Sequence, residues 1–440
     1  MWNLKLDKSF ISKKLLTDFS WTVLAKAVAM IGFFALDIAM ARLLGKDSYG
    51  EWSFFYSAII MLSHICWFGI NASVKVSISK QITKEKVSDC LKASLKLRLV
   101  ISLIFFFIVS FSSGILRDYL ESSSKYENLH ILMYGAGALI FLSSFSEFYK
   151  ALSIGMQCYR NLFLVTFMEY GGYLVFSIIA VLVLKNNTGV LAGYIMAGIF
   201  TLLLGYTLIR THFVKTDTEI SQKRHLQREI LMYAMPLLVT SIGEILLVES
   251  DTFFLGIFSI PAQVSIYSIS KKLCAKVHHI NYTFCVTVLP QFSMITSENY
   301  KEKYDKFRKY GLMNILLSIC VAVGLFITGD IIIDLLYGNE YSDAKIIFKI
   351  LLIFYLQHSI SYYFALFLEF QKKAAFESIC YFVTIVLNVA LEIWLVPLYG
   401  AYGAAISTIL SFIPYTILII FKAVKILKSY YHIYENEKDG

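Results

Sequence analysis

The chain alternates between long apolar runs and short polar connections. Each run of about 20 residues is long enough to cross a ~30 Å hydrocarbon core as a helix. No connection is long enough to form a soluble domain. The pattern predicts an all-α polytopic membrane protein with twelve transmembrane helices. The runs lie near residues 18–44, 49–70, 94–115, 127–149, 161–184, 189–210, 229–256, 262–292, 309–329, 344–368, 374–396 and 401–424.

The lysines and arginines that flank these runs test the arrangement. With a cytoplasmic N-terminus, 29 of them, including Arg98 and Lys150, fall on the cytoplasmic side. The few on the opposite side are Arg42, Lys46, Arg117, Lys125, Lys185 and Lys345. The positive-inside rule predicts such an asymmetry, and a missed helix would scramble it. We therefore expect both termini in the cytoplasm.

Composition agrees with a membrane protein. Hydrophobic residues make up 58% of the chain and charged residues 16%, whereas soluble domains carry about 25% charged residues. The net charge of +9 is spread between apolar runs and forms no continuous basic domain, so we expect no nucleic-acid partner. The seven cysteines include no CxxC pair and the eight histidines no HExxH motif, so we expect no metal site and no cofactor.

Weak internal similarities indicate a duplication. The segment ALSIGMQ at 151–157 aligns with ALFLEFQ at 365–371, and the same offset of 214 carries Gly189 onto Gly403. The Leu-Gly pair at 44–45 aligns with the pair at 255–256. We predict two homologous six-helix bundles, at residues 1–220 and 221–440, with a central cavity between them. That arrangement favours transport by alternating access.

A basic cluster interrupts the apolar stretch 251–290. It contains Lys271, Lys272, Lys276, His278 and His279. Residues 272, 276 and 279 share one side of a helix, so they could form a basic stripe that faces a water-filled path. The alternative is that these lysines extend to the lipid headgroups or pair with a carboxylate of a neighbouring helix.

Ionisable residues also occur in other apolar runs. Lys26 and Asp37 share a face of the first helix, and Glu244 and Asp251 lie seven residues apart on the seventh. We predict that Asp37, Glu244 and Asp251 carry a coupling ion, a proton or sodium. The alternative is that Asp37 and Asp251 only pair with Lys26 and the lysines of the basic cluster. Four other glutamates look more isolated, namely Glu147, Glu169, Glu369 and Glu392.

Three segments carry a resemblance to a known family. They are ARLLGKDSYG after the first helix, DTFFLGIFSIPAQVSIYSISKKL across the seventh and eighth, and LNVALEIWLVPLYGAYGAAISTIL near the C-terminus. The chain resembles the Wzx-type polysaccharide biosynthesis flippases of the MOP superfamily, which also contains the MATE transporters. The resemblance covers essentially the whole chain.

This resemblance implies a function. Family members move undecaprenyl-diphosphate-linked oligosaccharide units from the cytoplasmic to the outer leaflet of the bacterial inner membrane, for O-antigen, capsule or exopolysaccharide assembly. A polysaccharide polymerase and chain-length machinery would then be partners. We predict that Lys26, Lys271, Lys272, Lys276 and His278 bind the substrate, with Lys272 and Lys276 at the diphosphate.

Two other functions compete with flipping. A multidrug or cation antiporter of the same superfamily should have a cavity dominated by carboxylates, whereas the charge here is mixed and leans basic. A membrane enzyme such as a glycan polymerase should have a long outer loop or a catalytic cluster rich in His and Arg. Neither occurs in the sequence, so we expect no enzymatic activity.

Overall fold

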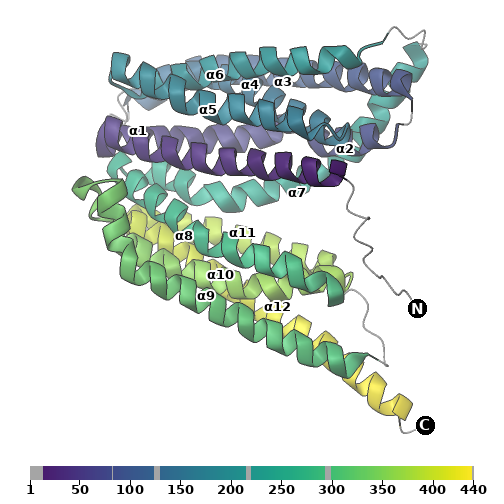
Figure 1. Ribbon diagram of the computed structural model, residues 1–440. Helices are drawn as coiled ribbons and strands as arrows, with labels where there is room; N and C mark the ends of the chain where they lie inside the picture. The colour runs from purple at the N-terminus through teal and green to yellow at the C-terminus, as the bar shows by residue number, and fades with distance from the viewer. Residues whose placement is uncertain (1–12, 82, 123–128, 215–219, 293–298, 439–440) are drawn as a thin grey trace. The chain divides into compact units, whose positions relative to one another are not determined.

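The structure is a computed structural model that describes residues 13–81, 83–122, 129–214, 220–292 and 299–438 (Figure 1). These residues are almost entirely helical and contain no strand, which confirms the predicted all-α class. The helices are α1 (Lys13–Trp67), α2 (Ile70–Ser79), α3 (Lys84–Ser122), α4 (Leu129–Gly155), α5 (Tyr159–Leu184), α6 (Asn187–Ile209), α7 (Ile220–Phe258), α8 (Pro261–Val288), α9 (Tyr300–Leu336), α10 (Ala344–Phe370), α11 (Ala374–Tyr399) and α12 (Ala401–Lys438). Short 3-10 turns are η1 (Arg210–His212), η2 (Leu289–Phe292) and η3 (Asn339–Tyr341).

Most of these helices are suited to a bilayer. Within the described ranges, 9 helices are long and apolar enough to cross a membrane, and the two segments of α7 together bring the number to 10. α1 consists of two helices merged across Gly45, whose φ of 77° is not helical. α8 is not among these helices, because every stretch of it that is long enough to cross a membrane contains its three lysines. The set is consistent with twelve spans in a multi-pass membrane protein.

The chain divides into two compact units, Met1–Ile245 and Leu246–Gly440. In the first unit, α5 packs against α1 and α6, and α3 packs against α4. In the second, α10 packs against α8 and α12, and α11 packs against α12 (Figure 1). The predicted boundary between homologous bundles at residues 220 and 221 stays a prediction.

Local backbone geometry recurs in the two units. Gln157, two residues after the end of α4, lies in the left-handed region (φ 55°), and Lys372, two residues after the end of α10, lies in the same region (φ 58°). In each case the N–H of the following residue donates a hydrogen bond to the carbonyl oxygen five residues earlier. Cys158 donates to Ser153, and Lys373 donates to Leu368. These are equivalent helix C-caps. The sequence alignment placed Gln157 opposite Gln371, so it was one residue out of register here.

A second feature that recurs in both units is a glycine that lies against the backbone of a neighbouring helix. A Cβ on Gly189 would lie 2.8 Å from the Ala180 carbonyl oxygen, and a Cβ on Gly403 would lie 2.3 Å from the Leu395 carbonyl oxygen. Only glycine allows the helices to approach this closely. Here the alignment of Gly189 with Gly403 agrees with the geometry, which supports an internal duplication.

Arg98 has a structural role that its place in the sequence hid. We counted it with the cytoplasmic charges, but its side chain is fully buried in α3. The break between α1 and α2 leaves carbonyls without helical partners. Arg98 donates to two of them, at Cys66 and Trp67 (both 3.3 Å), and also to the Asn71 side chain. It therefore stabilises the helix break and is not free to act as a topology signal or a ligand.

Candidate functional site

A buried polar cluster in the second unit is built around Asp251. This residue lies on α7 and is 4% exposed. Its Oδ2 accepts a hydrogen bond from the Tyr267 hydroxyl of α8 at 2.5 Å. Its Oδ1 has no hydrogen-bond partner among the described residues. One carboxylate oxygen is thus held in place, and the other is available to a ligand.

Glu392 on α11 completes the acidic part of the cluster. It is 0% exposed, and neither carboxylate oxygen meets full hydrogen-bond geometry with a described residue. Asp251 and Asn388 lie within hydrogen-bonding reach of it, and Lys271 is a neighbouring positive charge. From the sequence, Glu392 looked more isolated, near a helix end or in an interhelical hydrogen bond, and the structure places it beside Asp251 of another helix. A local signal was present, because Asn388 and Glu392 lie four residues apart and share a face of one helix.

Neutral oxygens surround these two carboxylates. The Asn388 amide oxygen accepts a hydrogen bond from Ser250 Oγ at 3.1 Å, and the Tyr267 hydroxyl lies 3.5 Å from Thr408 Oγ1. These side chains come from α7, α8, α11 and α12, so packing of the whole unit assembles the cluster. Hydroxyl, amide and carboxylate oxygens are the donors preferred by hard cations.

Lys271 lies beside this cluster but is engaged elsewhere. Its Nζ donates to the Val248 carbonyl and to Thr252 Oγ1 at 3.2 Å, and it lies 3.9 Å from Glu249 Oε2. Asp251 itself forms no ion pair within the described ranges. The suggested pairing of Asp251 with a lysine of α8 is therefore not present; Glu249 takes that role.

The cluster has the chemistry of a proton or cation site. Buried carboxylate oxygens without partners are costly unless they bind a proton or a cation. No group of three or more His, Cys, Asp or Glu side chains with metal-binding geometry occurs in the described residues. Asp251 and Glu392 are the residues that would hold the ion.

The other residues of the basic cluster behave differently from one another. Lys272 and Lys276 are half-buried on α8, and both have interaction partners. His278 stacks on His358 of α10 at 4.3 Å between ring centroids. Its ring is directed at a neighbouring helix, and its role as a substrate ligand stays a prediction.

Three further residues that the sequence predicted to bind substrate or a coupling ion lie in the first unit: Lys26, Asp37 and Glu244. Lys26 is exposed on α1 and makes no hydrogen bond or ion pair with the described residues. Asp37 is buried and accepts a hydrogen bond from the Tyr49 hydroxyl at 2.6 Å. Glu244 lies within α7, but its side chain falls outside the part that the structure describes. Asp37 and Asp251 thus share one feature, a tyrosine donor from the next helical segment.

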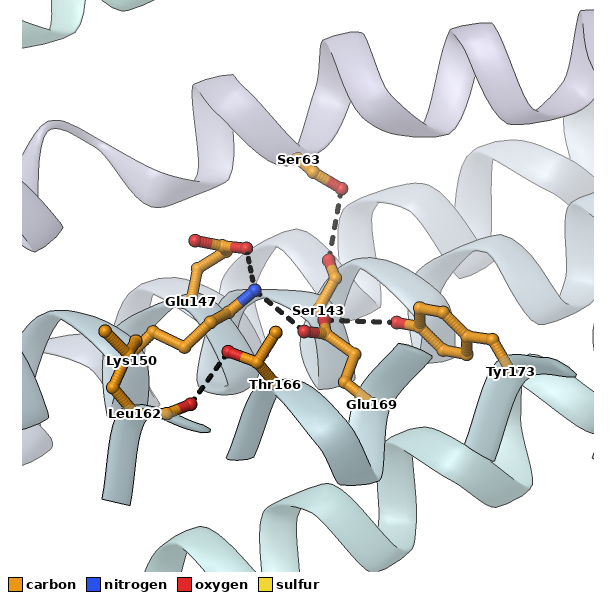
Figure 2. Close-up of polar contacts among 8 residues, drawn as sticks. All are labelled: Ser63, Ser143, Glu147, Lys150, Leu162, Thr166, Glu169 and Tyr173. Carbon is orange, nitrogen blue, oxygen red and sulfur yellow. Dashed lines mark hydrogen bonds and ion pairs between the residues drawn. The ribbon is translucent and has the colours of Figure 1, made fainter. Parts of the chain in front are cut away.

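Figure 2 shows a second charged cluster, in the first unit, that sequence analysis missed. Lys150 Nζ on α4 binds Glu147 one turn away and Glu169 Oε2 on α5 at 2.7 Å. Their side chains are 12%, 31% and 5% exposed, in the order Lys150, Glu147, Glu169. Tyr173 adds a longer hydrogen bond to Glu169 at 3.4 Å. Lys150 therefore belongs to a helix, not to a cytoplasmic connection as the sequence suggested.

This cluster is close to electrically balanced. Lys150 faces two carboxylates, and Arg98 of α3 adds a second positive charge within the electrostatic reach of Glu147. Two cations and two carboxylates leave no net charge for a ligand to neutralise. We therefore assign the Lys150 network to the packing of α3, α4 and α5.

We expect the variant Lys150→Met to lose roughly 3–5 kcal/mol of stability, because it leaves buried carboxylates unpaired. The double variant Lys150→Met/Glu169→Gln should recover part of this loss. Thermal unfolding of the purified proteins measures both effects. A single variant as stable as the parent would contradict the structural role of the network.

Comparisons with known proteins place the chain in a family. Residues 15–296 match the family described as polysaccharide biosynthesis protein. A probable low-salt glycan biosynthesis flippase of Haloferax volcanii, Agl15, is 24% identical over 382 residues, which cover 86% of this chain and 77% of that protein.

Solved structures show the fold. An inward-facing multidrug resistance MATE transporter of the MOP superfamily superposes with a TM-score of 0.70 at 12% identity, covering 93% of this chain and 99% of the other. The lipid II flippase MurJ in an inward closed conformation gives 0.66 at 16% identity, covering 93% and 89%. Because the family match extends over well more than half of its residues, the chain belongs to the polysaccharide biosynthesis protein family, and it has a MATE-like fold.

Proposed function

We propose that this protein flips lipid-linked glycans across a membrane. Family membership and the relationship to a glycan biosynthesis flippase support this assignment. A glycolipid of this kind combines a polar sugar head with an anionic phosphate linkage and an apolar tail. The head needs a hydrated path with cations, because an unpaired ion in hydrocarbon costs several kcal/mol or more.

The observation that carries the proposal is the polar surface of α8. Lys272, Lys276, His279, Thr283 and Thr287 recur at helical spacing, and the last three are exposed. The exposed side chains in the apolar parts of α5 and α9 are mostly hydrophobic, as contact with lipid requires; examples are Phe167, Ile179 and Val183 on α5, and Leu316, Ile327 and Ile331 on α9. α8 also exposes apolar residues beside its polar ones, namely Ile280, Tyr282 and Val286. Charged side chains in a span usually face water or protein, not lipid. The α8 surface therefore suits one wall of a hydrated path.

Lysines suit this task because their compact charge attracts phosphate without a rigid bidentate geometry. Lys272 and Lys276 are the residues that we propose for the phosphate groups. The lipid tail needs no protein site, since it can remain in the bilayer while the head moves. Lys26, exposed on α1, is the cation of the first unit that we propose for the same task.

Ion coupling is the second part of the proposal. Asp251 and Glu392 supply three carboxylate oxygens without hydrogen-bond partners, which supports binding of a proton or sodium ion. Asp37, buried beside Tyr49, is the corresponding candidate of the first unit. Uptake of one cation would neutralise a buried charge, so it would favour conformations in which the cluster stays closed.

The carrier lipid, the pathway and the membrane location follow from the resemblance to the Wzx-type flippases. We propose an undecaprenyl-diphosphate carrier, a role in O-antigen, capsule or exopolysaccharide assembly, and a bacterial inner-membrane location with both termini cytoplasmic. A polysaccharide polymerase and chain-length machinery would act on the product.

A multidrug or cation antiporter is the competing function, and the MATE-like fold fits it equally well. The basic α8 surface favours an anionic substrate, because a cationic drug would be repelled there. Deletion of the gene should make lipid-linked glycan accumulate in the cytoplasmic leaflet, and expression of the intact protein should reverse this. Normal glycan display with altered drug resistance would support the antiporter instead.

A further inference from the structure

Two half-buried histidines stack between α8 and α10. The His278 and His358 rings are 4.3 Å apart between centroids and only 19° from parallel. The Nδ1 atoms of both rings are buried and have no hydrogen-bond partner among the described residues. Buried polar atoms are nearly always paired, so these two nitrogens need an explanation.

The groups that face this pair are aromatic or basic. α8 contributes Tyr282 and His279, each with a centroid 6.3 Å from His278, and α10 contributes Tyr362 at 5.2 Å. Phe354 of α10 and Phe412 of α12 pack on His358 at 5.7 and 5.4 Å. No carboxylate contacts either imidazole in the described part of the chain, so nothing there would stabilise a charge on them.

We propose that the His278–His358 pair is a proton-binding site that controls the packing of α8 against α10. Both rings are neutral while they are stacked, because no carboxylate is present to offset the desolvation of even one charged imidazole, and a second charge would be repelled by the first. A proton binds after a ring has moved to water. Acidification therefore favours conformations in which α8 and α10 separate at this point, whatever substrate the protein carries.

The site differs from the Asp251 cluster in its ligand and in its pH range. Exposed histidine binds a proton near about pH 6.5. A pair kept neutral by the folded state binds fewer protons than the unfolded chain below that pH. Stability must then fall as the pH decreases through about 6.5. Proton uptake by a carboxylate pair in the folded state would have the opposite effect, since it would raise stability as the pH decreases.

Thermal unfolding of the detergent-purified protein at several pH values tests the proposal. We expect the parent to lose Tm between about pH 8 and about pH 5.5, and the double variant His278→Phe/His358→Phe to lose about half as much. Phenylalanine keeps the stacking but binds no proton. The matched control is His64→Phe, because His64 is also half-buried on an aromatic ring but its Nδ1 lies 2.9 Å from the Ile60 carbonyl oxygen. The control should keep the parent's pH dependence.

A second measurement does not depend on variants that fold well. Solid-state NMR of the full chain in lipid, with labelled histidines, separates neutral from charged imidazoles. We expect two of the eight histidines to remain neutral when the exposed ones are charged. Charging of all eight near about pH 6.5, or an unchanged Tm slope in the folded double variant, would overturn the proposal.

Discussion

Replacement of Lys272 and Lys276 together by glutamine should reduce glycolipid flipping about 100-fold or more. A hydrogen bond to a charged group contributes about 1.5–3 kcal/mol, so the loss of two phosphate contacts removes roughly 3 kcal/mol or more. Each single variant should retain part of the activity, because one lysine can still meet the phosphate. Transfer of a fluorescent diphosphate-linked glycolipid in proteoliposomes measures the rate.

Lysines elsewhere in the same unit provide the control. Lys345 and Lys349 on α10 pair with Asp334 and Asp330 at 2.7 Å each. Their replacement by glutamine removes the same charge without touching the α8 surface, and flipping should continue. If the α8 double variant also flips at the parental rate while remaining folded, the assignment of the phosphate site to α8 is excluded.

The second large effect concerns the Asp251 cluster. In the variants Asp251→Asn and Glu392→Gln, the affinity for the coupling cation should fall by more than about 100-fold, since loss of one partner of a buried charge interaction costs about 3–5 kcal/mol. A cation that binds only the folded protein raises its Tm, and this increase should disappear in both variants. Titration of the parent with sodium at fixed pH, and with protons at fixed sodium, identifies the ion.

Asp334→Asn is the matched control for this experiment, because Asp334 pairs with a lysine and lies outside the cluster. Its cation response should equal that of the parent. Retention of the full response in Glu392→Gln would mean that the carboxyl oxygens of Glu392 do not bind the ion. Flipping driven by an imposed ion gradient then shows whether binding is coupled to transport.

Some features followed from the sequence because they depend on local patterns. The apolar runs predict membrane helices, since a span must satisfy its own backbone and bury few charges. The all-α class, the polysaccharide biosynthesis family and the multi-pass membrane character were predicted from these runs and from the three quoted segments, and are confirmed. Asp251 was singled out correctly as a buried carboxylate, because a charge within an apolar run is informative by itself.

The partners of each charged side chain depended on the tertiary structure. Glu392 and Asp251 are 141 residues apart in the chain, and only the packing of α7 and α11 makes them neighbours. From the sequence, Lys150 and Arg98 looked like signals of membrane topology. In the structure, Lys150 pairs with a carboxylate of another helix, and Arg98 donates a hydrogen bond to a carbonyl at the end of α1. Spacing along one helix identifies residues that share a face, but not what that face meets.

The sequence by itself determined which segments are helices in a membrane, because hydrophobicity over about 20 residues decides that locally. The tertiary structure decided which charges are paired, which carboxylate oxygens lack partners and which histidines stack. These properties arise from side chains of different helices brought within a few ångströms, and the free energy of a buried charge depends on that surrounding rather than on its neighbours in the chain.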